Sequence, residues 1–189
     1  MNIVGLGKTG CDIVNSLCSL GPYRPWLIDT RKHRKKSFKL EKHADPELYE
    51  SSFPDLNKFF SSMKGEACLI LSGSDYESSG SLALLQQLKE ATGEEPKILY
   101  VKDSPSGLSL KQSMHHRMVM GVLQQYARSG LVDRMFLASC DNIASFMQQV
   151  PVSKYRQSLL DIICYGFHMY NVFHKSEPLI KSTSDTHAT

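Results

Sequence analysis

A glycine-rich loop near the N-terminus is the segment best suited to chemistry. Its residues, Gly5-Leu6-Gly7-Lys8-Thr9-Gly10, fit a G-x-G-x-x-G pattern between a short apolar run and a helical pattern. Such glycines allow a tight turn and let phosphate approach the backbone N–H groups that begin the helix. Asp29 ends the next apolar run, where dinucleotide-binding folds carry a ribose-binding acid. The pattern predicts a present or ancestral nucleotide site; the alternative is a turn required only for close helix–strand packing.

Other catalytic and metal-binding patterns are weak. Lys8-Thr9 resembles the end of a phosphate-binding P-loop, but the required glycine spacing before it is absent. His115 and His116 are neighbours on a predicted helix, so they point in different directions and we expect no metal site there. No G-x-S-x-G nucleophile motif occurs. We therefore expect no catalytic residue and no bound metal.

A basic run from Arg31 to Lys42 dominates the charge distribution. It holds seven lysines and arginines together with His33, in a chain whose net charge is only +3. The run is a candidate for binding nucleic acid or another polyanion, and the alternative is a solvated loop. Phe38 is its single aromatic residue, so stacking on single-stranded bases is not indicated.

The composition is that of an ordinary globular protein. The 189 residues suffice for one domain, with 41% hydrophobic and 22% charged residues. Apolar runs are short and no signal peptide is visible, so we expect a cytoplasmic protein that does not enter the membrane. The five cysteines are scattered, which favours reduced thiols.

Strand and helix patterns alternate along the chain. Predicted strands cover residues 2–5, 25–29, 67–71, 97–101 and 132–137, and predicted helices cover 9–20, 54–63, 81–91, 110–129, 142–149 and 153–173. The basic run is predicted as a loop or frayed helix, and residues 72–80 as a polar loop. Alternation of this kind predicts an α/β fold, a three-layer, Rossmann-like, mostly parallel sheet with helices on both faces. Residues 1–174 are expected to form this domain and residues 175–189 a flexible tail.

Several loops together resemble the nucleotide-binding domain of the tubulin/FtsZ superfamily. Ile3–Asn15 resembles its first nucleotide loop, and Ser72–Ser81 stands where a glycine-rich signature opens the next helix. The resemblance continues through Leu27–Thr30, His43–Glu47, Glu50–Ser52, Phe53–Leu71, Val132–Asn142 and Leu159–Asp161, and covers about residues 1–173. It implies a GTPase-domain-like fold and weak binding of GTP or GDP. The residues that it implies for the nucleotide are Gly7, Lys8, Thr9, Gly10, Cys11, Asp12, Asp29, Gly73, Ser78, Ser79, Gly80 and Phe167.

The signature loop departs from the family pattern. It reads Gly73-Ser74-Asp75-Tyr76-Glu77-Ser78-Ser79-Gly80, so Asp75 and Glu77 place carboxylates where phosphates should rest. A like-charge contact near 4 Å costs about 4 kcal/mol at an effective dielectric constant of 20, which would weaken phosphate binding severely. Lys8 and Arg31 are possible compensating cations. Phe167 either stacks on a base or belongs to the core.

The resemblance implies an assembly or interaction subunit, from a cell, a virus or a plasmid. In the superfamily the water-activating acids follow the central helix, near which this chain ends, so we expect no self-activated GTP hydrolysis. The last helix needs cover from the sheet, its tail or another protein, because its apolar residues include Leu159, Leu160, Ile163, Phe167 and Tyr170. A protein partner or a second copy is expected to cover this helix. Two alternatives remain open. One is a Rossmann-type NAD-binding enzyme or regulator using Gly5, Gly7, Gly10 and Asp29, and the other is a nucleic-acid-binding accessory protein using Arg31–Lys42.

Overall fold

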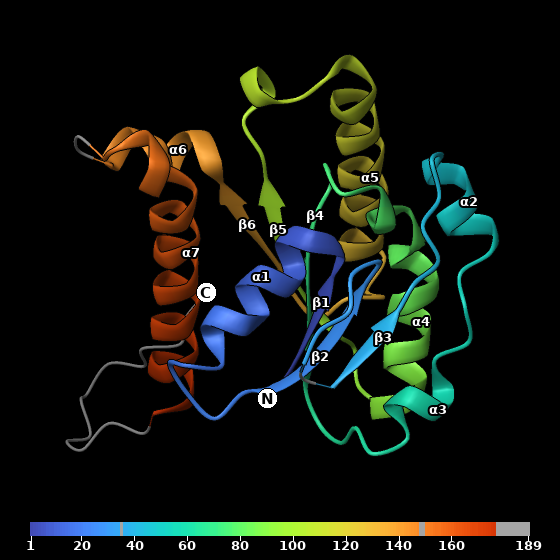
Figure 1. Cartoon of the computed structure of the whole chain (residues 1–189). Coiled ribbons are helices and arrows are strands. Elements are labelled where there is room, and N and C mark those ends of the chain that lie inside the picture. The colour runs from blue at the N-terminus through green and yellow to red at the C-terminus, as the bar shows by residue number, and fades with distance from the viewer. Residues whose placement is uncertain (35, 148–149, 177–189) are drawn as a thin grey trace.

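The computed structural model describes residues 1–34, 36–147 and 150–176, and these are built around one six-stranded, fully parallel sheet (Figure 1). The strands are β1 (Asn2–Leu6), β2 (Arg24–Asp29), β3 (Ser37–Lys39), β4 (Ala67–Ser72), β5 (Lys97–Lys102) and β6 (Met135–Ser139). Their spatial order is β3-β2-β1-β4-β5-β6, so that β1 and β4 lie at the centre. Every carboxyl end therefore meets at one edge of the sheet, where ligands bind in folds of this kind.

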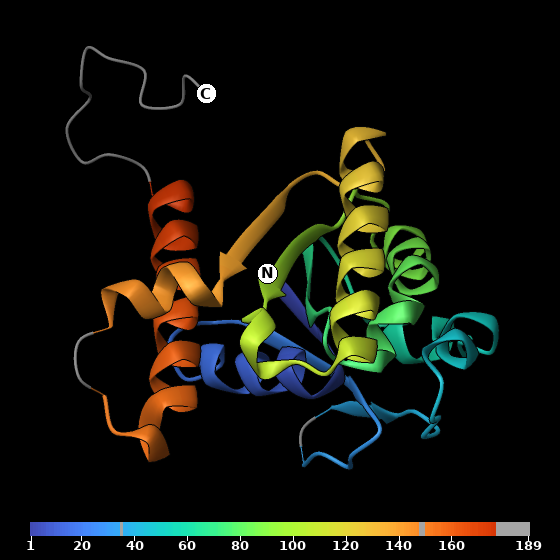
Figure 2. The same ribbon diagram turned by 90° about the horizontal axis from the view of Figure 1, so that it is seen from above.

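Helices connect the strands and cover both faces of the sheet. They are α1 (Gly7–Leu17), α2 (Pro46–Ser51), α3 (Asn57–Phe60), α4 (Ser81–Thr92), α5 (Leu110–Arg128), α6 (Cys140–Phe146) and α7 (Val152–Lys175), with short 3-10 helices η1 (Tyr76–Gly80) and η2 (Pro105–Gly107). Helices α1, α6 and α7 lie on one side, and α3, α4 and α5 on the other (Figures 1 and 2). The prediction of a three-layer, Rossmann-like parallel sheet is confirmed.

The central strands are buried on both faces, which explains their continuous apolar sequences. All residues of β1 and β4 are buried, and alternate side chains enter two separate clusters. Val4 and Leu69 pack under α4 and α5, whereas Ile3 and Ile70 pack under α1 and α7. The sheet thus fixes the start of α1 and the loop after β4 side by side.

Several predicted boundaries were wrong. The basic run contains a short edge strand, β3, because residues 37–39 pair with Leu27–Asp29. The predicted helix over 54–63 shrinks to α3, and the preceding helix α2 was missed. Strand β6 begins at Met135 rather than Val132. The predicted helix end at Gln149 lies outside the described residues.

Helix α7 buries the apolar residues that the sequence left without a partner. Leu159, Leu160, Ile163 and Phe167 are each at most 7% exposed, packed in one cluster with residues of α1 and the sheet. The sheet and α1 therefore provide the cover for these four residues, and contact between α7 and a partner stays a prediction. The helix runs to Lys175, one residue beyond the predicted domain end, and the remainder of the predicted tail, residues 177–189, lies outside the described residues. Within the described part of the chain, no helix has the length and apolar character that crossing a membrane requires.

Candidate functional site at the carboxyl edge of the sheet

The glycine loop turns directly from β1 into α1. Gly7 has a φ of +72°, a left-handed conformation that side chains disfavour. A Cβ atom on Gly5 would stand 2.8 Å from the backbone nitrogen of Cys11, and one on Gly10 would collide with the carbonyl oxygen of Ile70. Close helix–strand packing, the alternative considered for this motif, is thus a sufficient reason for Gly5 and Gly10.

Asp75 occupies the space in front of the first turn of α1. Its Oδ2 accepts a hydrogen bond of 2.7 Å from the backbone N–H of Thr9. Helix α1 has no side-chain cap from Leu6 and no acid in its own first turn, so Asp75 supplies the missing acceptor from a different loop. A Cβ on Gly7 would lie 2.9 Å from the Cβ of Asp75. The carboxylate is therefore packed against the loop that the sequence predicts to hold phosphate.

The environment of Asp75 disfavours its charge. The pKa of the Asp75 carboxyl is raised to about 6: burial and the nearby carboxylates of Glu77 and Asp103 raise it, while the hydrogen bond from Thr9 lowers it. Burial is the largest of these effects, because it removes water from the charged form. Glu77 itself accepts a hydrogen bond from the Thr30 hydroxyl at 3.2 Å. The site is thus richer in acidic groups than a phosphate site should be.

The rest of the signature loop is tied to α5 by a serine and a histidine. The Nδ1 atom of His115 lies 2.8 Å from the carbonyl oxygen of Gly73, and its Nε2 lies 2.7 Å from the hydroxyl of Ser79. A carbonyl can only accept, so Nδ1 carries the proton, and in the neutral ring Nε2 accepts from Ser79. Burial lowers the pKa of His115, which favours that neutral form.

Three further residues of this loop are held by packing. A Cβ on Gly73 would collide with the Tyr100 hydroxyl, and one on Gly80 with the ring of Phe53. The hydroxyl of Ser78 is buried, and among the described residues it has no hydrogen-bond partner. Gly73 and Gly80 therefore serve close packing, and Ser79 is committed to His115.

Asp29 and Asp12 are both engaged by arginines. Asp29 is 1% exposed, and its Oδ2 accepts from Arg31 Nε at 2.7 Å and lies 2.9 Å from His33 Nε2. Arg31 also reaches Asp12 at 3.4 Å, and Arg156 lies 3.6 Å from the other oxygen of Asp12. Arg31, with Lys8, was one of two candidate cations that could compensate for the carboxylates of the signature loop. The structure instead pairs it with Asp29 and Asp12.

The predicted residues do not all converge on one site. Lys8 and Thr9 line a cavity of about 460 Å³ beside Asp75, together with Asp103 and Arg156. Cys11 is fully buried beneath this edge. Phe167 is 6% exposed and packs edge-to-face on Phe136 at 5.6 Å, which places it in the core and away from any base.

Sequence reasoning missed a polar cluster beside the signature loop. The carboxylate of Asp103 accepts hydrogen bonds from Ser72 and, at 2.5 Å, from Ser74. Asp103 follows β5 directly, and Ser72 ends β4, so their position at adjacent strand ends was the available signal. Ser72 begins the segment that resembles the glycine-rich signature, whereas Asp103 belongs to no short motif.

The basic run is only partly free. Arg31 is paired as described, and Lys36 Nζ lies 3.4 Å from the ring centroid of Trp26. The other described cations of the run, Lys32, Arg34, Lys39 and Lys42, are exposed. Lys35 lies outside the described residues. The exposed cations are compatible with a solvated loop as well as with a polyanion surface.

Comparison with solved structures identifies the fold. An empty FtsZ dimer from M. jannaschii superposes with a TM-score of 0.74 at 11% identity, over 95% of this chain and 56% of that one. An FtsZ mutant from the same organism gives 0.70 at 10% identity, over 95% and 58%. The CetZ2 protein from Haloferax volcanii, in a GTPγS-bound protofilament, gives 0.71 at 13% identity, over 89% and 57%.

The described chain thus has the fold of the tubulin/FtsZ N-terminal domain, and the predicted resemblance is confirmed at the level of fold. It spans a little over half the length of each of these structures. No protein-family model and no curated protein matches the sequence.

Proposed function

We propose that this chain is a tubulin/FtsZ-like assembly or interaction subunit that binds guanine nucleotide weakly or not at all and does not hydrolyse GTP by itself. The observation that carries the proposal is the hydrogen bond between the Asp75 carboxylate and the Thr9 N–H, 2.7 Å long. Backbone N–H groups at this helix start are the donors that a phosphate would need. A chain that supplies its own anion there has no need of a nucleotide to complete the turn.

The fit of a nucleotide to the remaining residues is also poor. A bound phosphate would face Asp75 and would lie near Glu77, and like charges repel by about 1–4 kcal/mol at 4 Å, depending on the dielectric. Arg31, one of the two cations considered as compensation, already contacts Asp29 at 2.6 Å. Phe167 is buried in the core, where no base can stack on it. These observations favour weak or absent binding over ordinary GTP binding.

The NAD-binding alternative is less well supported. Its ribose-binding acid would be Asp29, whose Oδ2 is held by Arg31 and His33. Removing these partners would leave cations unpaired in a half-buried site, which is unfavourable. The polyanion alternative rests on the exposed cations alone, and no specific observation favours it.

The outer face of α7 is the surface that we assign to self-association or to a protein partner. Tyr165, Met169 and Phe173 are 57%, 62% and 69% exposed, and Ile162 and Val172 extend this surface. Helix α7 stands at one side of the molecule, where it packs against α1 and α6 (Figures 1 and 2). Large exposed apolar side chains that recur on one helix are typical of an interaction surface.

The proposal is tested by measuring binding, hydrolysis and assembly on the same protein. Thermal shift and calorimetric titration with GTP, GDP and NAD⁺ measure binding, and phosphate release measures hydrolysis. Sedimentation velocity over a concentration series, with and without GTP, measures self-association. We expect little or no stabilisation by any nucleotide, no phosphate release, and self-association or partner binding that GTP does not alter.

The alternatives give different results in the same assays. Tight binding of GDP, or assembly that requires GTP, contradicts the proposal. Stabilisation by NAD⁺ alone supports the Rossmann-type alternative. Binding to a DNA or RNA duplex that disappears with added salt supports the polyanion alternative.

A further inference from the structure

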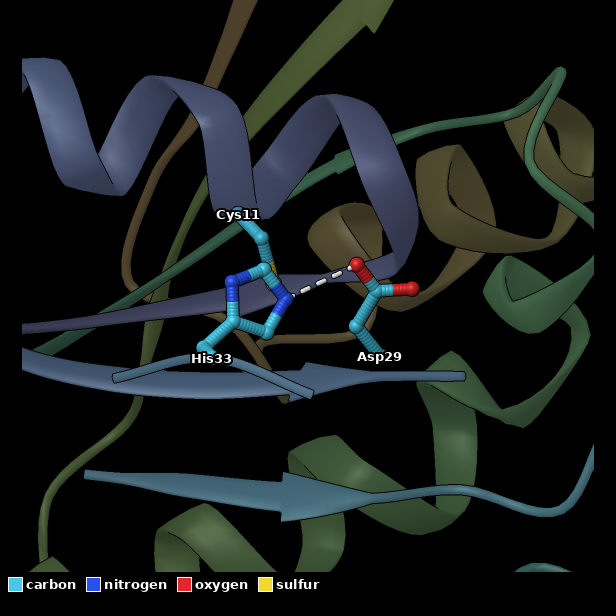
Figure 3. Close-up of side chains that lie close together, drawn as sticks. All are labelled: Cys11, Asp29 and His33. Carbon is cyan, nitrogen blue, oxygen red and sulfur yellow. Dashed lines mark hydrogen bonds and ion pairs between the residues drawn. The ribbon is translucent and has the colours of Figure 1, made fainter. Parts of the chain in front are cut away.

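Three side chains that commonly bind metals meet beneath the first turn of α1. The Cys11 Sγ, a carboxylate oxygen of Asp29 and a ring nitrogen of His33 all lie within 4.8 Å of one another. Figure 3 shows the His33 ring beside Cys11 with one nitrogen directed at the Asp29 carboxylate. The three residues come from α1, the end of β2 and the loop that follows it, so the fold brings them together.

We propose that Cys11, Asp29 and His33 bind a divalent transition-metal ion of the zinc class, with water as the fourth ligand. Thiolate, imidazole and carboxylate are the ligands that zinc takes in proteins. A soft sulfur in the set argues against magnesium and calcium, which prefer oxygen alone. The ion would fasten α1 to the end of β2.

The geometry requires only modest adjustment. Zinc bonds of about 2.3 Å to sulfur and about 2.0–2.2 Å to nitrogen and oxygen place tetrahedral ligand atoms about 3.3–3.5 Å apart. His33 Nε2 and Asp29 Oδ2 are 2.9 Å apart, so they would separate slightly, and the two ligand atoms farthest apart, within 4.8 Å of each other, would approach by about 1.3–1.5 Å. His33 lies in a loop, which allows it to move.

The surroundings are those of an enclosed site. Cys11 is fully buried, while the side chains of Asp29 and His33 are 1% and 13% exposed. Burial raises the pKa of the Cys11 thiol, and the charge of Asp29 raises it further, so without a metal the thiol keeps its proton. Its Sγ then donates to the Gly5 carbonyl oxygen at 3.3 Å. A bound metal would displace that proton and form the thiolate.

Arg31 contacts one of the three proposed ligands, and its positive charge would repel a bound cation. Its Nη2 lies 2.6 Å from Asp29 Oδ2, but Asp12 offers a second carboxylate 3.4 Å away. With a metal bound, one dication and Arg31 balance the thiolate and the two carboxylates. The protein therefore already holds both the counter-charge and an alternative partner for Arg31.

The motifs of the sequence did not indicate this site, and no bound metal was expected from them. Only Asp29 and His33 share a short spacing, and Cys11 belongs to the glycine loop, where its neighbours suggested a nucleotide. The proposal does not rest on the proposed function. It assigns Cys11 and Asp29 a role that needs no nucleotide.

Cobalt is the probe for the test, since Co²⁺ bound to a thiolate absorbs in the near ultraviolet and four-coordinate Co²⁺ absorbs in the visible. The full chain, freed of metal by chelation and kept reduced, is titrated with Co²⁺ and then with Zn²⁺. We expect one Co²⁺ per chain with both bands, their loss when Zn²⁺ displaces it, and a higher melting temperature with either ion. A folded wild-type protein without the thiolate band overturns the proposal and leaves His33 and Asp29 as a polar contact without a metal.

Variants identify the ligands. Cys11→Ala should abolish the thiolate band. His33→Ala should weaken Co²⁺ binding at least tenfold, because mutation even of residues that only hydrogen-bond to metal ligands causes losses of that size. His33→Ala changes a loop residue, so it remains informative if Cys11→Ala fails to fold. Cys140→Ala, at another buried thiol, is the matched control and should bind like the wild type. Retention of the band in folded Cys11→Ala, or unchanged affinity in His33→Ala, overturns the assignment.

Discussion

The backbone N–H of Thr9 donates to the Asp75 carboxylate at 2.7 Å, joining the first helix to a loop 66 residues away. The contact is possible because β1 and β4 are adjacent in the sheet, so the segments that follow them leave the same edge together. A carboxylate that accepts from a helix start stabilises it by about 0.5–2 kcal/mol. The burial of that carboxylate opposes the gain.

Asp75→Asn is expected to stabilise the protein at neutral pH. The pKa of Asp75 in the folded protein, about 6, exceeds the ordinary value of 3.8. The unfolding free energy of the wild type therefore falls as pH rises from about 4 to about 6, and it remains at this lower value at higher pH. Asparagine retains an acceptor for Thr9 without the charge. We expect a gain in unfolding free energy of about 1–3 kcal/mol at pH 7.5 that shrinks toward pH 4.5, measured by urea denaturation.

Glu77 and Asp103 repel the Asp75 carboxylate in the wild type, so the loss of that repulsion is part of the expected gain. Asp133→Asn, at a half-exposed acid on the opposite edge of the sheet, serves as the control and should show no such dependence on pH. If the unfolding free energies of Asp75→Asn and the wild type differ by the same amount at both pH values, the prediction is contradicted.

Removing both carboxylates from the signature loop is expected to restore nucleotide affinity. In the double variant Asp75→Ala, Glu77→Ala the N–H of Thr9 is freed and two like charges disappear. Because one such charge opposes a phosphate by about 1–4 kcal/mol, GDP should bind at least tenfold more tightly than to wild type. Titration with a fluorescent GDP analogue measures this, with Asp133→Ala as the control. Equal affinities would show that Asp75 and Glu77 do not limit binding.

Gly7→Ala is expected to destabilise the protein by about 1–3 kcal/mol, because it combines a left-handed φ with a contact to Asp75. Two other glycines separate these causes. Gly93 has the same φ of +72° but nothing near its Cβ position, and Gly121 has open space and an ordinary helical conformation. Gly93→Ala should therefore cost less, and Gly121→Ala should stabilise by about 0.5–1 kcal/mol. Chemical denaturation of all three tests the order, and a Gly7→Ala variant no worse than Gly93→Ala would contradict it.

Met169→Glu is expected to weaken self-association or partner binding without unfolding the protein. Met169 is 62% exposed on α7, so its replacement removes apolar surface and changes stability by no more than about 0.5 kcal/mol. Gln124→Glu adds the same charge at an exposed position of α5 and serves as the control. Sedimentation velocity should show a lower association constant for Met169→Glu alone. An equal loss in both variants would indicate a general charge effect.

Most of the fold was predictable because its signals are local. The buried strands β1, β4 and β5 are continuous apolar runs, and Gly93 ends α4 in the left-handed conformation that glycine favours. Strand β3 was missed because its residues, Ser37–Lys39, have an edge strand's mixed composition and pair only through the neighbouring β2. Helix α3 was overestimated because Leu56 and Met63 are buried core residues that lie outside its single turn.

The candidate site was predictable in part. The sequence placed Asp75 and Glu77 near the glycine loop, but only the fold gives the contact with Thr9 and the arginine pairs of Asp29 and Asp12. Phe167 was ambiguous because an aromatic residue on an apolar helix has the same pattern in a core and beside a ligand. The cluster of Cys11, Asp29 and His33 joins three segments, so no spacing rule could find it.

The central position of β1 has a consequence for the order of synthesis. Its partners β2 and β4 are completed only at Asp29 and Ser72, so on the ribosome the first strand keeps one open edge until residues 67–72 emerge. An unpaired apolar strand is prone to aggregate. Asp75 leaves the ribosome immediately after β4. Residues 67–75, made within a short interval of translation, therefore pair with the open edge of β1 and supply the acceptor for the first turn of α1.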